Sequence, residues 1–195
     1  GFSFDNELPR HRHYLEPFEL GSCLVSNAEY LAFVKAGAYD DPGLWLAEGW
    51  DWLRTNEISH PLYWRKSEEG WSEFTLHGLV PLDGARAARH LSYFEADAYA
   101  RWAGARLPTE AEWESAAAAA INPAPTLPPT VGPELGQLFD TGWQWTSSSY
   151  APYPGFQPAS GAVGEYNGKF MVNQYVLRGA SSATPVGHSR LSYRN

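Results

Sequence analysis

Cysteine, methionine and long apolar runs are almost absent from this sequence. The one cysteine, Cys23, cannot form an intramolecular disulfide, so we expect a small buried side chain in a protein of the reducing cytoplasm. No run approaches the roughly 20 apolar residues of a membrane-spanning helix, and no segment has the charged-then-apolar pattern of a signal peptide. These absences argue against the disulfide-rich secreted and the membrane-embedded classes of protein.

Basic residues are also few, with 14 Lys and Arg against 22 Asp and Glu and a formal net charge of -8. A diffuse acidic field does not attract a phosphate backbone or an anionic membrane, so we expect neither nucleic acid nor a membrane as a partner. The G-x-S-x-G, P-loop and G-x-G-x-x-G patterns are missing as well. Acyl hydrolysis and the binding of nucleotides or dinucleotides therefore receive no support.

Aromatic residues, by contrast, are abundant, with 9 Trp, 11 Tyr and 9 Phe. Flat, rigid rings must do much of the packing, which favours an irregular, loop-rich fold over a helical bundle. A chain of 195 residues is long enough to bury a core of its own, and it shows no repeat or low-complexity tail. We predict a single domain over residues 1–195.

Capping boxes predict three main helices. In each box an N-cap hydroxyl is followed three residues later by a glutamate that can bond back to the cap. The boxes are Ser26 with Glu29, Ser92 with Glu95, and Thr109 with Glu112. Gly37 and Gly104 follow the first two helical patterns, where a left-handed glycine commonly ends a helix.

The remaining sequence predicts short strands and long loops, and thus an α+β fold of modest helix content. Candidate strands are Tyr14–Leu20, Trp71–Leu76 and Tyr175–Arg178. The Pro-rich residues 121–136 predict a surface loop, and the Asn-Gly pair within EYNGKFM favours the turn of a hairpin.

The histidines do not predict a metal site formed by this chain alone. His11 and His13 are two residues apart, which on a strand places them on one face, but the others follow no H-x-x-x-H or H-E-x-x-H spacing. A closed metal site needs three or four convergent donors. We therefore assign no metal ligand.

Several motifs resemble the formylglycine-generating-enzyme, or sulfatase-modifying-factor, superfamily. GARLPTEAEWESAA is the most recognisable, preceded by HLSYFEADAYARWAG and followed by VLRGAS in the family's order. The resemblance implies a C-type-lectin-like α+β fold with little regular secondary structure. Formylglycine generation itself is not expected, because Ala183–His188, which corresponds to the family's pair of reactive cysteines, contains no cysteine.

A narrower resemblance is to the C-terminal domain of the sulfoxide synthases of ergothioneine biosynthesis. It rests on FDNELPRHRHYLEPFEL, LVSNAEYLAFVKAGAYDDPGLWLAEGW, HPLYW, SSYAPYPGF, AVGEYNGKFMVNQYVLRG and TPVGHSRLSYRN. It implies a non-haem iron(II) enzyme that uses O2 to join the sulfur of cysteine or γ-glutamylcysteine to hercynine. In that family three histidines of an N-terminal DinB-like domain hold the iron. We therefore expect a domain truncated at both ends, inactive alone, with a DinB-like partner in the same protein.

The resemblance also implies calcium sites. Their usual acidic or Asn residue and their glutamate are replaced in DTGWQW by Thr141 and Gln144, which removes hard oxygen charge and disfavours calcium.

The narrower resemblance assigns site residues in the C-terminal third. Tyr150 matches the family's acid tyrosine, which acts on the oxygen species, and Tyr153 matches a contact to hercynine. The alternative for Tyr150 is a packed ring whose hydroxyl bonds a backbone carbonyl. Residues 152–155 are expected to form an ordered loop that presents both tyrosines outward.

The remaining candidates are Asn195 and three arginines. Asn195 matches an Asn beside the substrate's trimethylammonium and carboxylate. Arg178, Arg190 and Arg194 are candidates for binding a carboxylate, although structural ion pairs are the better explanation for at least two of them. Asp5, Glu7 and Arg10 are predicted to anchor the N-terminal segment.

Other functions fit the same motifs. Selenium in place of sulfur, or histidine as the acceptor in an ovothiol-type reaction, uses the same family chemistry. A non-catalytic lectin-like module is a further alternative, because the fold also serves as a scaffold for loops that bind ligands.

Overall fold

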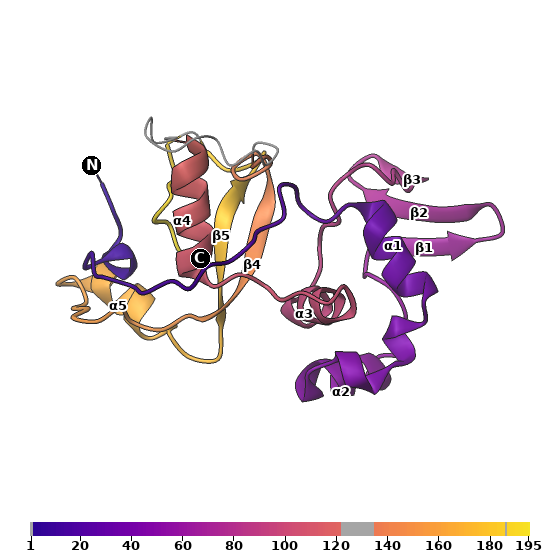
Figure 1. Ribbon diagram of the computed structural model, residues 1–195, viewed down its shortest axis with the longest axis horizontal. Coiled ribbons are helices and arrows are strands. Elements are labelled where there is room, and N and C mark those ends of the chain that lie inside the picture. The colour runs from indigo at the N-terminus through magenta and orange to yellow at the C-terminus, as the bar shows by residue number, and fades with distance from the viewer. Residues whose placement is uncertain (1, 122–134, 186) are drawn as a thin grey trace. The chain divides into compact units, whose positions relative to one another are not determined.

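The computed structural model describes residues 2–121, 135–185 and 187–195 of the chain (Figure 1). The fold consists of two compact units. The first unit combines Gly1–Cys23 with Pro108–Asn195, and the second unit is Leu24–Leu107. The single domain over residues 1–195 stays a prediction, and the predicted loop at 121–136 falls almost entirely outside the described residues.

The second unit is built around an aromatic core. Its helices are α1 Asn27–Lys35, α2 Ala47–Thr55 and α3 Tyr93–Trp102, with short 3-10 turns η2 Ala38–Asp40 and η3 Pro42–Leu44. Tyr30 and Phe33 on α1 are fully buried, and the Tyr30 ring stacks on Tyr99 of α3 at a centroid distance of 5.4 Å. Aromatic rings, which each bury a large apolar area, thus provide the packing that aliphatic side chains provide in a helical bundle.

An antiparallel three-stranded sheet completes the second unit. Its strands are β1 Trp64–Ser67, β2 Gly70–Thr75 and β3 Gly78–Pro81, in the order β1-β2-β3. Strand β2 confirms the prediction at Trp71–Leu76. Trp64 points into the aromatic core and is 1% exposed. Together with the helices, this sheet confirms the predicted α+β class.

The capping boxes form as predicted. The hydroxyls of Ser26 and Ser92 accept from the amides of Glu29 and Glu95, and the glutamates accept from the cap amides at 2.8 Å. Gly37 and Gly104 adopt the left-handed φ values of +77° and +69° that let the chain turn away from a helix end.

Helix α2 was missed because its sequence lacks the usual start signals. Its N-cap, Leu46, offers no side-chain bond, and Gly49 lies within the helix. The structure explains this glycine: a Cβ there would lie 2.6 Å from Cβ of Phe94 on α3. Close packing of α2 on α3 therefore requires glycine at this position, although glycine has a low helix propensity.

The first unit holds the other elements. They are η1 Asp5–Glu7, α4 Glu110–Ile121, β4 Thr141–Ser149, α5 Ala162–Gly168 and β5 Tyr175–Ser181. Strands β4 and β5 pair antiparallel, with Trp143 opposite Gly179, and α4 lies along this pair (Figure 1). The bonds of the third capping box join Thr109 and Glu112 at the start of α4. Strand β5 confirms and extends the prediction at Tyr175–Arg178.

Three local predictions were wrong. Residues 14–20 form no strand, and Tyr14 is 80% exposed; Pro17 lacks the N–H that a central strand would need. The Asn-Gly pair ends α5 and makes no hairpin. Cys23 is exposed rather than buried. The strand and the hairpin were predicted from short sequence patterns, and the burial of Cys23 was predicted from its residue type. None of these signals encodes contacts that are distant in sequence.

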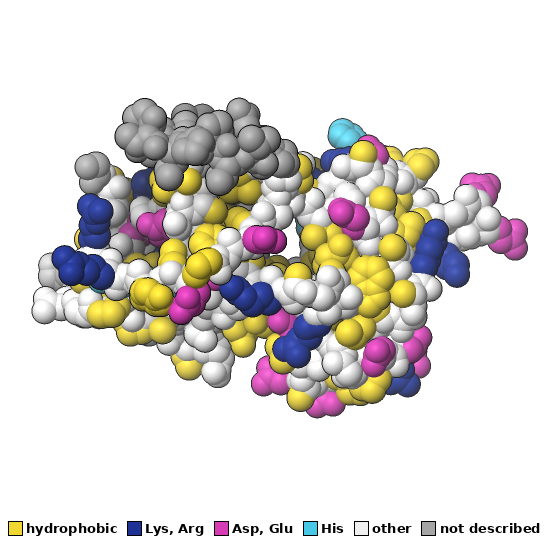
Figure 2. All heavy atoms as spheres, in the orientation of Figure 1, with side chains coloured by type: hydrophobic (Ala, Val, Ile, Leu, Met, Phe, Trp, Pro, Cys, Tyr) yellow, Lys and Arg dark blue, Asp and Glu magenta, His cyan; other side chains and the backbone are white. Residues whose placement is uncertain are grey.

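The surface carries both signs of charge. On the face drawn in Figure 2, basic side chains do not gather into one continuous patch, and acidic and hydrophobic side chains lie between them. Among the described residues, no helix combines the length and the apolar character needed to cross a membrane.

Glu95 should matter far more to stability than its counterpart Glu29. Both cap a helix, but Glu95 is buried and also accepts the hydroxyl of Tyr39 at 2.7 Å. Glu95→Ala should lower the free energy of unfolding by roughly 2–4 kcal/mol, because it removes a cap and leaves a buried hydroxyl without its acceptor. Glu29→Ala should cost about 1 kcal/mol or less. Urea unfolding of the two variants provides the test, and equal losses would contradict the role given to Glu95.

Candidate functional site

Three of the candidate residues, Arg178, Arg194 and Tyr153, meet around a carboxylate that was not predicted, Glu110 at the start of α4. Arg194 donates to both of its oxygens, from Nε at 2.9 Å and from Nη2 at 3.0 Å. Arg178 on β5 donates from Nη2 at 3.0 Å, and the hydroxyl of Tyr153 donates at 3.1 Å. One carboxylate therefore joins α4, the loop after β4, β5 and the C-terminal segment.

Both arginines of this cluster are buried and paired within the chain, although Nε of Arg178 is buried without a partner in the described structure. The side chains of Arg178 and Arg194 are 0% and 1% exposed. Arg178 also donates to the carbonyls of Leu191 and Tyr193 and pairs with Glu114, while Arg194 donates to the carbonyls of Asn6 and Ala151. An unpaired buried charge costs several kcal/mol, so these pairings are structural ion pairs. A further role for Arg194 in substrate binding stays a prediction.

Tyr150 is buried, with its ring under the guanidinium of Arg194 at 5.1 Å from the ring centroid. Its oxygen accepts a hydrogen bond of 2.7 Å from Nδ2 of Asn6. Burial raises the pKa of Tyr150, and the Asn6 hydrogen bond and the Arg194 charge oppose that rise. In the described part of the chain this is the hydrogen bond of the Tyr150 hydroxyl, and it bonds no backbone carbonyl there.

Tyr153 is held at its ring and at its hydroxyl. Arg194 lies over one ring face at 3.9 Å from the centroid, and the His11 ring packs against Tyr153 at 4.4 Å. The hydroxyl accepts from Arg178 at 3.0 Å and donates to Glu110. Burial raises the pKa of Tyr153 to about 12, so the phenol stays neutral near physiological pH. Neither tyrosine points outward as the sequence predicted, because both ring and hydroxyl contacts draw them inward.

A second carboxylate, Glu7, anchors the N-terminal segment. It accepts from the guanidinium of Arg190, from the hydroxyl of Ser192 and from the amide of Phe4. Burial alone would raise the pKa of Glu7, but the hydrogen bonds from Arg190, Ser192 and Phe4 together lower it. This confirms the predicted anchoring role of Glu7.

Asp5 likewise anchors the N-terminal segment, because its carboxylate accepts from the side chain of Asn167 and from the amide of Ala159. Arg190 pairs with Glu7, and a substrate contact by Arg190 stays a prediction.

Asn6 is a site residue that sequence reasoning missed. It is 4% exposed, and its amide nitrogen donates to Tyr150 and to the carbonyl of Arg194 at 3.2 Å. Its carbonyl oxygen Oδ1 is buried without a partner in the described structure. The only sequence signal was its place between two acidic residues that anchor the same turn.

Asn195 extends the edge of β5. Its backbone pairs with Leu177, through an amide that donates at 3.2 Å and a carbonyl that accepts at 2.8 Å. Its side chain is exposed, and its predicted contact with substrate stays a prediction.

The described residues do not fit the iron that the resemblance implies. No group of three or more His, Cys, Asp or Glu side chains in residues 2–121, 135–185 and 187–195 is arranged to hold a metal ion. The Thr141 and Gln144 side chains do not offer the charged oxygens of a calcium site either, because Thr141 bonds Asp140 at 2.8 Å and the Gln144 amide bonds backbone carbonyls.

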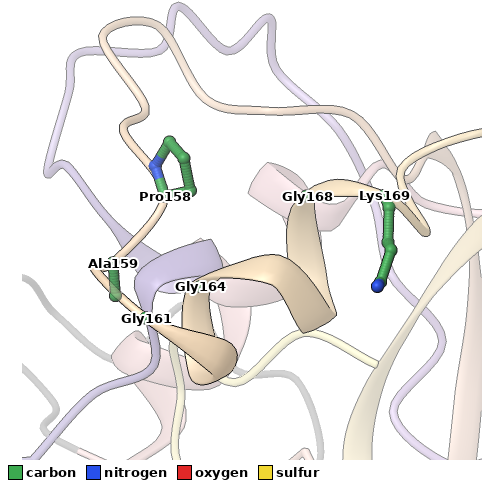
Figure 3. Close-up of a pocket in the computed structure, with 6 residues that line it drawn as sticks. All are labelled: Pro158, Ala159, Gly161, Gly164, Gly168 and Lys169. Atoms are coloured by element: carbon green, nitrogen blue, oxygen red, sulfur yellow. The ribbon is translucent and has the colours of Figure 1, made fainter.

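A separate pocket of about 480 Å³ lies beside α5 (Figure 3). Three of the six residues that line it are glycines, and Lys169 is the charged residue among the six. No candidate tyrosine, arginine or Asn195 lines this pocket. It is therefore distinct from the cluster around Glu110, and we assign it no role in the chemistry.

Comparison with known proteins identifies relatives of this chain. The profile of the sulfatase-modifying factor enzyme 1-like domain matches residues 1–126. A hercynine oxygenase from Mycobacterium tuberculosis is 33% identical over 99% of this chain and 52% of its own length. The ergothioneine biosynthesis protein 1 of Schizosaccharomyces pombe is 28% identical over 100% of this chain and 25% of its own length. The formylglycine-generating enzyme of Streptomyces coelicolor is 36% identical over 60% of this chain and 41% of its own length.

These matches agree with the motifs. The chain spans about half the length of the hercynine oxygenases that it resembles. The likeness to proteins named for hercynine oxygenation and ergothioneine biosynthesis confirms the predicted resemblance, and the domain match confirms the C-type-lectin-like α+β fold. With a domain match over residues 1–126 and one-third identity across nearly the whole chain, this protein belongs to the sulfatase-modifying factor enzyme 1-like family.

Proposed function

We propose that this chain is the substrate-binding part of a hercynine oxygenase that acts in ergothioneine biosynthesis. One observation carries the proposal: the likeness to hercynine oxygenases covers 99% of the chain, whereas the likeness to formylglycine-generating enzymes covers 60%. The reaction is the O2-dependent joining of a cysteine or γ-glutamylcysteine sulfur to the imidazole ring of hercynine, with formation of a sulfoxide. Selenium donors and an ovothiol-type acceptor remain alternative substrates of the same chemistry.

The proposal assigns the iron(II) to a DinB-like helical domain of the same protein. The described residues of this chain offer no ligand set for it. The contribution of this chain is then to bind and orient the organic substrates and to hold a proton where the reaction needs one.

Tyr150 is the proposed acid. Its oxygen accepts from Asn6, so the proton of its hydroxyl is free to point toward a substrate or an oxygen species. Its pKa is raised, so the phenol is neutral and carries that proton at physiological pH. A weak acid of this kind is useful only when it is held within hydrogen-bond reach of its target. The Asn6 hydrogen bond and the Arg194 guanidinium supply that restraint.

Tyr153 is less suited to proton transfer. Its hydroxyl donates to Glu110 and accepts from Arg178, so its proton and one lone pair are already engaged. We assign to Tyr153 a packing contact with the hercynine amine or imidazole. Arg194 and Arg190 then act indirectly, because each is bound to a carboxylate of the chain and thereby fixes the residues around Tyr150.

Loss of the Tyr150 hydroxyl should abolish most of the activity of the full-length protein. With hercynine, O2, iron(II) and either thiol, the wild-type protein should form the sulfoxide product, and Tyr150→Phe should slow that reaction roughly 10²–10⁴-fold, the range for removal of a general acid. Tyr14→Phe, at an exposed tyrosine, is the matched control and should leave the rate unchanged. Mass spectrometry of the products measures both.

The same assay tests the proposed function and the role of Tyr150 separately. A wild-type protein that forms no hercynine-derived product with any thiol contradicts the function itself. A Tyr150→Phe variant with the wild-type rate contradicts only the role of Tyr150. Reaction of selenium donors, or of histidine as the acceptor, in the same assay would identify an alternative substrate.

Asn6→Asp tests whether the amide orients the phenol. A carboxylate cannot donate, so the Tyr150 hydroxyl would turn to donate to it and would no longer face the substrate. We expect kcat to fall with little change in KM, and we expect Asn6→Asp combined with Tyr150→Phe to be no slower than Tyr150→Phe alone. Asn56→Asp, at an exposed asparagine, controls for the added charge. Additive losses in the double variant would show that Asn6 acts independently of Tyr150.

Glu110→Gln tests the electrostatic core of the site. The change removes the carboxylate between two buried guanidiniums and should lower the free energy of unfolding by about 3–5 kcal/mol. Glu114→Gln is the matched control, because Glu114 also pairs with Arg178 but is 42% exposed. Its loss should be about 1 kcal/mol or less. Denaturant unfolding compares the two, and a small loss for Glu110→Gln would refute its central position.

A further inference from the structure

We infer that the carboxamide of Gln144 takes the place of a structural cation in this fold. The family resemblance implies calcium, but in this chain an NH2 group fills the centre of a ring of backbone carbonyls. The inference concerns the stability of the first unit and does not depend on the proposed function.

The carbonyl ring is defined by three oxygens that converge on Nε2 of Gln144. Those of Leu138, Gly142 and Gln137 lie at 3.0, 3.2 and 3.3 Å from it. A carboxamide nitrogen carries two hydrogens, so three acceptors compete for two donors. Three carbonyl oxygens around only two N–H donors resemble the oxygen shell that surrounds a hard cation.

The opposite end of the carboxamide fixes its orientation. Oε1 of Gln144 accepts from Nε1 of Trp113 on α4 at 2.6 Å. The indole nitrogen can only donate, so the partner atom must be the oxygen. A flipped amide would place its oxygen among three carbonyl oxygens and its NH2 against the indole N–H. The nitrogen therefore belongs at the centre of the carbonyl ring.

The backbone is shaped to bring these oxygens together. Gln137 adopts a left-handed φ of +63°, and Gly179 on β5 has a φ of +91°. A Cβ at position 179 would lie 2.5 Å from the Leu138 carbonyl oxygen and 2.7 Å from Nε2 of Gln144. The glycine thus leaves the space in which the carbonyl ring closes on the amide.

Charge explains why an amide fits where calcium does not. Calcium sites combine carbonyl oxygens with carboxylates that balance the ion's charge. The carbonyl ring contains no carboxylate, and Asp140, the nearest acid in sequence, accepts from the Thr141 hydroxyl. The neutral NH2 group offers partial positive charge to neutral oxygens without needing an anion. By the same reasoning, Gln144→Glu would supply the missing charge and convert the carbonyl ring into a calcium site.

Thermal unfolding with and without calcium tests the inference, with circular dichroism as the readout. The wild-type chain should unfold at the same temperature in EDTA and in excess calcium. Gln144→Glu should unfold roughly 5 °C or more lower in EDTA, because a carboxylate then faces three carbonyl oxygens. Calcium should restore most of that loss in a concentration-dependent way, and magnesium should not.

Gln144→Met is the matched control, since it keeps the length of the side chain but offers neither donor nor charge. It should unfold at a lower temperature than wild type, equally in EDTA and in calcium. If Gln144→Glu is unfolded in EDTA, recovery of the folded spectrum on addition of calcium supports the inference. A wild-type chain that calcium stabilises overturns it, as does a Gln144→Glu variant that calcium does not stabilise or refold.

Discussion

The interaction on which the first unit depends is the carboxylate of Glu110 between the buried guanidiniums of Arg178 and Arg194. Two cations that are almost without exposed surface cannot persist in a protein interior unless an anion and carbonyl oxygens surround them. Glu110 provides that anion from the first turn of α4, where the helix dipole also favours a negative charge. Strand β5, the C-terminal segment and the loop after β4 are bound to α4 through this one group.

The same network separates the roles of the two tyrosines. It engages the hydroxyl of Tyr153 on both sides, and it leaves Tyr150 restrained by a ring contact with Arg194 and by one hydrogen bond from Asn6. Asn6 is in turn placed by the N-terminal segment, which the bonds to Glu7 hold against the C-terminal residues. The ring and the hydroxyl oxygen of Tyr150 are therefore held by residues from both ends of the sequence, although the tyrosine itself lies on a loop.

The features that the sequence predicted are those that local chemistry decides. The capping boxes at Ser26 and Ser92 and the strand at Tyr175 depend on neighbours within a few residues, and the structure forms them. Family motifs singled out Tyr150 and Tyr153 as candidates but could not reveal their partners, because Glu110 lies 43 residues from Tyr153 and Asn6 lies 144 residues from Tyr150. The exposure of Cys23 likewise depends on distant contacts that a residue type does not encode.

Gln144 and Glu110 both neutralise buried polar groups, but the groups around them carry opposite partial or full charges. In one case a carboxylate lies between two cations, and in the other an NH2 group lies among three carbonyl oxygens. Both place a polar side chain between α4 and the β4–β5 pair, since Gln144 also binds Trp113. Among the described residues, the buried apolar cluster at this contact is small, with Trp113, Ala117 and Leu138 as its core. Directional polar bonds, which tolerate little displacement, therefore fix α4 on the strands and hold the tyrosine loop that follows β4.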